Sequence, residues 1–206
     1  MDGVLVDSEP LHKRAKELAF AEVGIILSEA VYDSYKGRPD RTMMPEVLSA
    51  RGRAADAEHV MQRKKEFYEQ IEHELQAIAG AAEFVRWAAT RFRLALATSA
   101  TPRNRAAALR MLGIEACFQS IVDTDRFQRP KPDPEIFQVA MRDLALETEE
   151  CWVIEDSIAG VGAGKSAGAF TVGITTTFDG ETLLTAGADL MVGSFAELQK
   201  CLERTD

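Results

Sequence analysis

The sequence predicts an α/β protein in which a parallel sheet carries an inserted, all-helical segment. Up to about residue 80 the apolar residues recur with a helical period, and after Gly80 short apolar runs alternate with helical stretches. Polar motifs follow several of these runs, as expected where parallel strands end at one edge of a sheet. We therefore expect a core domain of residues 1–7 and 81–206 and a helical domain of residues 8–80.

The helical segment divides into three predicted helices. One runs from about Pro10 to Gly24, where the glycine ends it. A short one lies around Pro45 to Ala50, and a long, charged one extends from Ala54 to Leu75. Acidic residues open this last helix, where the helix dipole favours negative charge. We expect helices alone between residues 8 and 80.

The later part of the chain contains the predicted strands. Their short apolar runs are Arg93–Thr98, Ser120–Val122, Trp152–Glu155 and Phe170–Ile174, with Leu190–Val192 as a further candidate. Helical or long connections separate them, which is typical of a parallel sheet covered on both faces.

Composition limits the classes of partner. The chain of 206 residues has 24 Lys and Arg against 33 Asp and Glu, a net charge of −9, and no basic run, which argues against nucleic-acid binding. No apolar run approaches a membrane span, and no targeting signal is evident. The cysteines Cys117, Cys151 and Cys201 form no Cys-x-x-Cys pair, so reduced thiols and a cytoplasmic location are expected. The sequence does not indicate an oligomeric state.

Two polar motifs precede residue 100. Asp2 and Asp7 flank a glycine turn at the start of the chain, where two solvated acids in a loop would also explain the pattern. Thr98 and Ser99 follow an apolar run, and their hydroxyls and the backbone amides there could hold phosphate oxygens. The alternative is a Ser/Thr cap on a helix that begins near Pro102, and such a helix start is itself an anion site.

Two further motifs lie in the second half. Lys131 is braced by prolines on both sides, so it could bring a point charge to a phosphate, although an exposed turn is the alternative. Glu155 and Asp156 end a buried strand and suit an oxygen-ligand site for magnesium, unless one of them caps the next helix. The stretch from Gly162 to Ser166 is similar to the end of a P-loop, but Ala159 stands where that motif needs glycine. We discount nucleotide binding.

The four sites, in order and approximate spacing, resemble the signature of the haloacid dehalogenase-like superfamily across nearly the whole chain. The helices after Asp-Ser-Glu-Pro-Leu-His resemble the cap of its beta-phosphoglucomutase and phosphoglycolate phosphatase branch. The resemblance implies a Rossmann-like core and a magnesium-dependent phosphohydrolase. It implies that Asp2 is the general acid and base, that Thr98 and Lys131 hold phosphate, and that Asp2, Glu155 and Asp156 form the Mg²⁺ site.

The resemblance is incomplete at the start of the chain. In the family the first, central strand ends in Asp-x-Asp, and Met1 occupies the middle position of that motif. We expect the aspartate nucleophile, and an apolar strand before it, to be encoded immediately ahead of Met1. The alternative is a catalytically silent relative that binds phosphorylated ligands. The in-frame codons ahead of Met1 distinguish the two.

The helical cap is expected to select a small phosphorylated metabolite, such as a sugar phosphate or a phosphoglycolate-like ester. Its candidate groups are His12 and the cations Arg38 and Arg41, with Ser99 contributing from the core; surface roles for the cap residues are the alternative. The resemblance implies that phosphosugar mutases of this branch place basic residues near the positions of Asp40 and Gln70. This favours a phosphatase over a mutase here, unless Arg38 or Arg41 supplies the basic group. A dehalogenase is a weaker alternative, because those relatives lack an acid at the position of Asp2.

Overall fold

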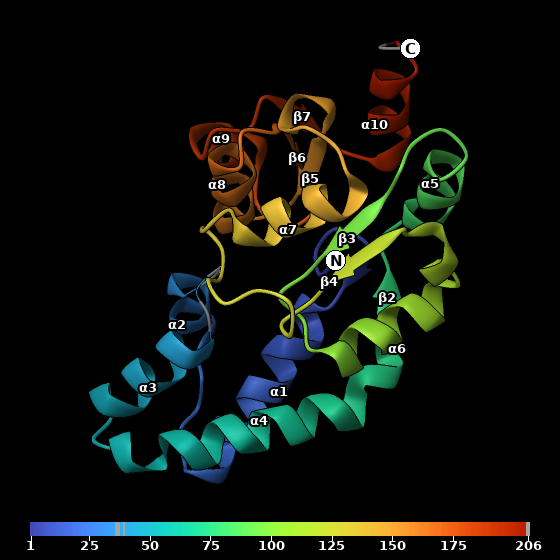
Figure 1. The fold of residues 1–206 in the computed structure, drawn as a ribbon. Coiled ribbons are helices and arrows are strands. Elements are labelled where there is room, and N and C mark those ends of the chain that lie inside the picture. Colours follow the sequence, from blue (N-terminus) through green and yellow to red (C-terminus); the bar gives the residue numbers. More distant parts are fainter. Residues whose placement is uncertain (36–37, 39, 205–206) are drawn as a thin grey trace. The chain divides into compact units, whose positions relative to one another are not determined.

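A computed structural model of the chain describes residues 1–35, 38 and 40–204 (Figure 1). The chain forms two compact units: Met1–Asp7 with Gln76–Asp206, and Ser8–Leu75. The larger unit contains a small antiparallel ribbon in which β1, Val6–Asp7, pairs with β2, Gln76–Ala77. The expectation of helices alone between residues 8 and 80 is wrong at β2. A strand of two residues is too short to show a period in sequence.

The α/β class with parallel strands is confirmed. Each of the five predicted runs contains a strand, and four of the five match it residue for residue. They are β3, Ala95–Ala97; β4, Ser120–Val122; β5, Trp152–Glu155; β6, Phe170–Ile174; and β7, Leu190–Val192. The strands form two parallel sheets rather than one: β3 pairs with β4, and β6 lies between β5 and β7.

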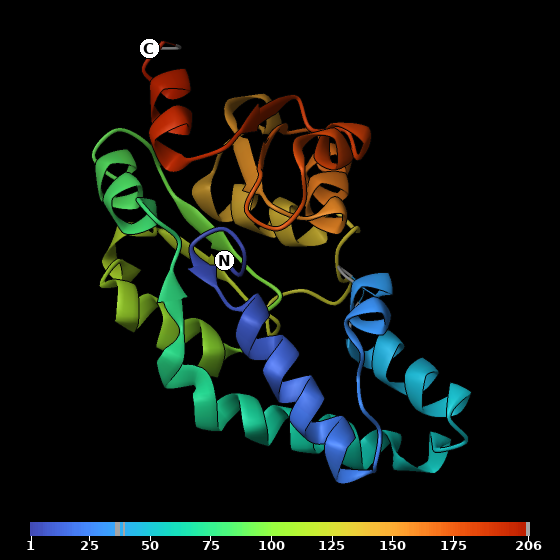
Figure 2. The ribbon, with the colours of Figure 1, turned by 180° about the vertical axis from the view of Figure 1, so that it is seen from behind.

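Helices cover these sheets. α7 packs on β3 and β4, α8 on β5 and β6, and α9 on β6 and β7. α10 packs against α5, and Figure 2 shows the red and green helices side by side from behind. The helices of this unit are α5, Ala81–Ala88; α6, Pro102–Leu112; α7, Glu135–Leu144; α8, Ile158–Ser166; α9, Gly180–Thr185; and α10, Phe195–Leu202; single 3-10 turns are η3, Glu115–Cys117, and η4, Thr148–Glu150.

The smaller unit is helical and has its own core. α1 packs along α4, and α3 packs on α4 as well. Phe20, Met44 and Leu48 are completely buried in the cluster between these helices. α3 begins at Asp40, ahead of the predicted start at Pro45, and α2 was not predicted. The helices are α1, Glu9–Glu22; α2, Glu29–Ser34; α3, Asp40–Ala50; and α4, Ala57–Ile71, with η1, Ala54–Asp56, and η2, Glu72–Glu74, at the two ends of α4.

Asp40, at the start of α3, forms ion pairs with lysines of two other helices of the smaller unit. Its two carboxylate oxygens lie 2.9 Å from Lys16 Nζ on α1 and 2.7 Å from Lys64 Nζ on α4. Burial alone would raise the pKa of Asp40, but the two ammonium groups outweigh it and lower the pKa to about 2. The negative charge of Asp40 is therefore neutralised by two lysines of the same unit.

Replacing Asp40 by Asn is expected to destabilise the chain by about 1–2 kcal/mol at neutral pH, after allowance for partial solvent screening. The folded pKa of Asp40 lies below the unfolded value, so this stabilisation is present above about pH 4 and is lost as the pH falls toward about 2. Urea denaturation at pH 7 and pH 3 measures it. The exposed Asp33 serves as a control, and an equal effect of Asp33→Asn would contradict the assignment.

Within the described residues, no helix is both long enough and apolar enough to cross a membrane. The three cysteines are free thiols, as expected from their spacing.

Candidate active site

The start of the chain forms a tight turn against the carboxyl end of β5. The carbonyl of Met1 accepts a hydrogen bond from the amide of Leu5 at 2.7 Å, and Gly3 has a φ of +67°, which favours glycine. A Cβ atom on Gly3 would lie only 1.9 Å from Oδ2 of Asp156. The Asp2–Gly3 backbone therefore lies directly against the Asp156 carboxylate, and no side chain fits between them.

Lys131 and Glu155 form a buried ion pair beside this turn. Lys131 Nζ donates to Glu155 Oε1 at 2.6 Å, and the two side chains are 15% and 5% exposed. The other oxygen of Glu155 accepts from the hydroxyl of Ser157 at 3.2 Å. Ser157 caps α8 by accepting from the amide of Gly160, so the cap is the serine and not an acid. Lys131 is therefore no exposed turn residue.

The charges of this cluster act on one another. Burial disfavours both charged forms, but Glu155 and then Asp156 and Asp2 hold the pKa of Lys131 above its ordinary value. Burial would likewise raise the pKa of Glu155, yet Lys131 holds it below its ordinary value. The structure thus brings Asp2, Lys131, Glu155 and Asp156 into one electrostatic group.

Asp156 has the opposite shift. Burial and the neighbouring Glu155 raise its pKa to about 6, although the hydroxyl of Thr177 and the ammonium group of Lys131 act in the other direction. Asp156 is only 7% exposed. A second carboxylate next to a buried one is costly unless positive charge is added.

These residues fit a hard divalent cation. In the described part of the chain, no three His, Cys, Asp or Glu side chains gather closely enough to hold a metal, because Glu155 is turned toward Lys131 and Ser157. The Asp156 carboxylate lies close to the backbone of the Asp2–Gly3 turn. Carboxylate and main-chain oxygens are ligand types that Mg²⁺ takes, so these residues could hold such an ion. A cation there would relieve the repulsion that raises the pKa of Asp156.

Thr98 and Ser99 lie at the carboxyl end of β3. Thr98 is 1% exposed, its amide donates to Val122, and its hydroxyl accepts from the amide of Ala100 at 3.1 Å. Ser99 is exposed. The cap of α6 is Thr101, so neither predicted phosphate residue serves as the helix cap. Within the described residues, neither hydroxyl is hydrogen-bonded to the group around Lys131.

Known proteins were compared with this chain. A family model described as haloacid dehalogenase-like hydrolase matches residues 1–168. The chain belongs to this family of hydrolases.

Its relatives include a phosphorylated carbohydrates phosphatase of Thermotoga maritima, 35% identical over 93% of this chain and 91% of the relative. The beta-phosphoglucomutase of Bacillus subtilis is 30% identical over 96% and 88%. The crystal structure of a candidate beta-phosphoglucomutase from Thermotoga maritima covers 99% of this chain and 96% of its own, with a TM-score of 0.82 and 33% identity. The predicted family branch and the predicted enzyme class, a phosphohydrolase, are confirmed.

Three of the predicted substrate residues of this haloacid dehalogenase-like hydrolase, His12, Arg38 and Arg41, lie in the smaller unit, whereas Ser99 lies in the larger one. His12 stacks on Tyr68 with ring centroids 4.4 Å apart, and its Nδ1 lies 3.1 Å from Lys64 Nζ. Arg38 pairs with Glu46 at 2.7 Å and is 43% exposed, and Arg41 is exposed. Lys36, Gly37 and Pro39 of the same predicted turn lie outside the described residues. His12 thus belongs to the polar cluster around Asp40, whereas Arg38 and Arg41 lie on the surface of their unit.

Three polar residues of the larger unit were not predicted from the sequence. Thr177 hydrogen-bonds the Asp156 carboxylate, and Thr176 donates to the carbonyl of Gly3. Asp123, 5% exposed at the end of β4, accepts from Arg105 at 3.2 Å. All three follow predicted strands, so the rule that functional groups gather at strand ends could have found them.

Replacing Gly160 by Ala is expected to destabilise the protein by about 1–3 kcal/mol, because the added Cβ would lie 1.9 Å from Oε2 of Glu155 and force that side chain away. Gly162 is the matched control on the same helix. Its Cβ would make an ordinary 3.6 Å contact with Pro132, so alanine there should be neutral or stabilise by up to about 1 kcal/mol. Thermal unfolding of the two alanine variants measures these changes in stability. Equal unfolding midpoints would contradict the prediction that a Cβ at position 160 is destabilising.

Proposed function

We propose that this protein is a magnesium-dependent phosphatase that hydrolyses small phosphorylated metabolites, such as sugar phosphates or phosphoglycolate-like esters, through an aspartyl-phosphate. The observation that carries the proposal is the buried Lys131–Glu155 pair beside Asp156 and the Asp2 turn. A buried ammonium group beside carboxylates suits the transfer of a phosphoryl group between an oxygen of the substrate and a carboxylate. The nucleophile in this proposal is an aspartate encoded just ahead of Met1.

In the first half-reaction, the nucleophilic carboxylate attacks phosphorus, and the bond between phosphorus and the ester oxygen breaks. Asp2 donates a proton to the departing alcohol. In the second half-reaction, Asp2 takes a proton from water, the water oxygen attacks phosphorus, and the bond to the carboxylate breaks. Inorganic phosphate leaves, and both acids return to their starting forms.

Lys131 and the Thr98 hydroxyl hold phosphate oxygens in this scheme, with Ser99 nearby in sequence. Lys131 is the cation whose positive charge the surrounding acids maintain. The Asp156 carboxylate and the backbone carbonyl of Asp2 would hold Mg²⁺, with Glu155 in support. When bound, the ion supplies charge compensation for the carboxylates and the phosphate oxygens.

The smaller unit is the cap in this proposal, and His12, Arg38 and Arg41 are its candidate substrate contacts. A mutase is the second candidate, because the Bacillus subtilis relative is a beta-phosphoglucomutase. Asp40 favours the phosphatase, because it stands near a position where mutases of this branch place a basic group. Its carboxylate also forms ion pairs with Lys16 and Lys64, so these two lysines already have an acidic partner.

A phosphate-release screen tests the proposal. The protein is expressed from DNA that includes the in-frame codons ahead of Met1, and sugar phosphates and phosphoglycolate are supplied with Mg²⁺ or with a chelator. A phosphatase releases phosphate steadily and loses the activity with the chelator. Activity that requires a sugar bisphosphate and releases little phosphate would favour the mutase. Magnesium-dependent binding of phosphate esters without turnover would mark a silent relative and overturn the proposal.

A further inference from the structure

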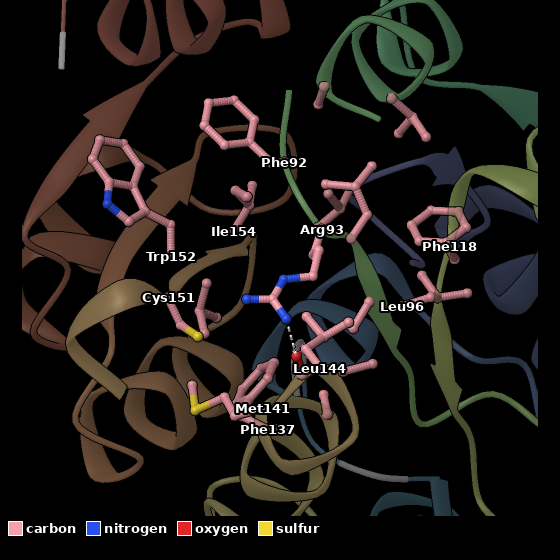
Figure 3. Close-up of a pocket in the computed structure, with 18 of the residues that line it drawn as sticks. Phe92, Arg93, Leu96, Phe118, Phe137, Met141, Leu144, Cys151, Trp152 and Ile154 are labelled. Atoms are coloured by element: carbon pink, nitrogen blue, oxygen red, sulfur yellow. Dashed lines mark hydrogen bonds between the residues drawn. The ribbon is translucent and has the colours of Figure 1, made fainter. Parts of the chain in front are cut away.

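An apolar pocket of about 330 Å³ lies between β3 and β5 in the larger unit. Figure 3 shows aromatic and aliphatic side chains around it, with Arg93 reaching across to Leu144. Arg93 Nη1 donates to the carbonyl of Leu144 at 2.7 Å, so this cation already has a partner. None of the described residues that line the pocket carries a hydroxyl group. Hydroxyl partners for the carboxylates at the end of β5 therefore come from elsewhere.

The strand on the other side of β5 leads to such partners. β6 runs parallel to β5, with Gly173 opposite Glu155, so the residues that follow β6 lie beside those that follow β5. Three consecutive threonines, Thr175–Thr177, come directly after Ile174, the last residue of β6. The register thus places a run of hydroxyl groups next to Asp156.

Two of these threonines bond to the two parts of the proposed cation site. The hydroxyl of Thr177 hydrogen-bonds the Asp156 carboxylate, and the hydroxyl of Thr176 donates to the carbonyl of Gly3. A carboxylate can accept several hydrogen bonds, so a bond from one threonine fixes its orientation and leaves lone pairs for an ion. The bond from Thr176 likewise fixes a carbonyl one residue after that of Asp2.

The three segments meet at Gly3. A Cβ atom there would lie 1.9 Å from Asp156 Oδ2 and 2.7 Å from Thr177 Oγ1. The turn, the carboxylate and the threonine thus pack with no room for a side chain between them. Because groups packed this closely cannot move independently, a shift of the threonines displaces both the carboxylate and the turn.

We propose that Thr176 and Thr177 are positioning residues, which hold the Asp156 carboxylate and the Asp2–Gly3 backbone in the arrangement that binds a divalent cation. Neither threonine needs to touch the ion. Residues that orient metal ligands in this way contribute about 10- to 100-fold to metal affinity. The inference rests on the magnesium site of the proposed function, but it concerns ion affinity and not phosphate transfer.

Replacing Thr177 by Val tests the proposal, because Val keeps the shape of Thr and removes its hydroxyl. Binding is measured with Mn²⁺, which takes the same oxygen ligands as Mg²⁺, through the electron paramagnetic resonance signal of the free ion. The dissociation constant of Thr177→Val should exceed that of the parent by about 10-fold or more, and Thr176→Val should also bind more weakly. Thr177→Ser restores the hydroxyl and should recover most of the lost affinity.

Thr175→Val is the matched control. Thr175 is exposed, and its hydroxyl lies 3.5 Å from the carbonyl of Val192, so the same substitution there should leave Mn²⁺ binding unchanged. Asp156→Asn locates the ion, since it should abolish the binding. Thermal unfolding without the ion shows that each variant is folded. Thr177→Ala and Thr176→Ala take the place of a Val variant that does not fold.

The outcomes separate this inference from the proposed function. Affinities of Thr176→Val and Thr177→Val equal to that of the parent would overturn the inference, and so would an equal loss for Thr175→Val. A parent chain that does not bind Mn²⁺, or whose binding survives Asp156→Asn, would overturn both the inference and the magnesium site. Weaker ion binding by the Thr176 and Thr177 variants, together with no phosphate release from any ester, would support the inference and contradict the proposed function alone.

Discussion

Replacing Asp2 by Asn is expected to lower phosphate release by about 10²- to 10⁴-fold in protein that includes the codons ahead of Met1. Asn keeps the size and the hydrogen-bonding shape of the side chain but can neither donate a proton to the departing alcohol nor accept one from water. The Asp2 carboxylate also contributes to the field that keeps Lys131 charged. The loss should appear in kcat, while the KM for the ester changes little.

Steady-state kinetics with a phosphate ester that has a good leaving group separates the two roles of Asp2. Such an ester needs no protonation of its alcohol, so the first half-reaction should recover and a burst of alcohol should precede slow turnover. The control is Glu83→Gln, which removes an exposed acid from α5. A rate for Asp2→Asn within a factor of two of the parent would remove Asp2 from the mechanism.

Replacing Lys131 by Met is expected to have two effects of different origin. Met keeps the length of the stem but leaves the Glu155 carboxylate buried without its 2.6 Å partner, which should destabilise the larger unit by about 3–5 kcal/mol. Phosphate release should also fall, because the site loses the cation proposed to hold phosphate oxygens.

The double variant Lys131→Met with Glu155→Gln distinguishes the two effects. Removing both charges eliminates the unpaired buried carboxylate, so the free energy of unfolding should return most of the way to the parent value. Catalysis should stay low, because the cation is still missing. Recovery of both stability and activity would show that Lys131 acts only in packing. Chemical denaturation and phosphate-release assays measure the two quantities.

Much of the architecture could be predicted from local sequence. The strands from Ser120 to Val122 and from Trp152 to Glu155 were predicted to the residue, because short apolar runs between polar segments suit buried parallel strands. The failed P-loop spacing likewise leaves packing as the role of Gly164 in α8, where a Cβ would lie 2.7 Å from Thr171 of β6. The order of the motifs identified the family, and the family model confirms it.

What the sequence determined by itself is therefore most of the elements, the family and the strand ends that carry the polar residues, because these follow from local periodicity and from order along the chain. Only the tertiary structure decided the partners: Lys131 with Glu155, Gly3 against Asp156, and Asp40 with two lysines. The partners in each of these contacts are far apart in sequence. The energies of these contacts depend on the distance between the partners in the folded protein and on their burial. A local sequence pattern contains neither quantity. The same holds for the pocket between β3 and β5, whose lining comes from segments along most of the larger unit.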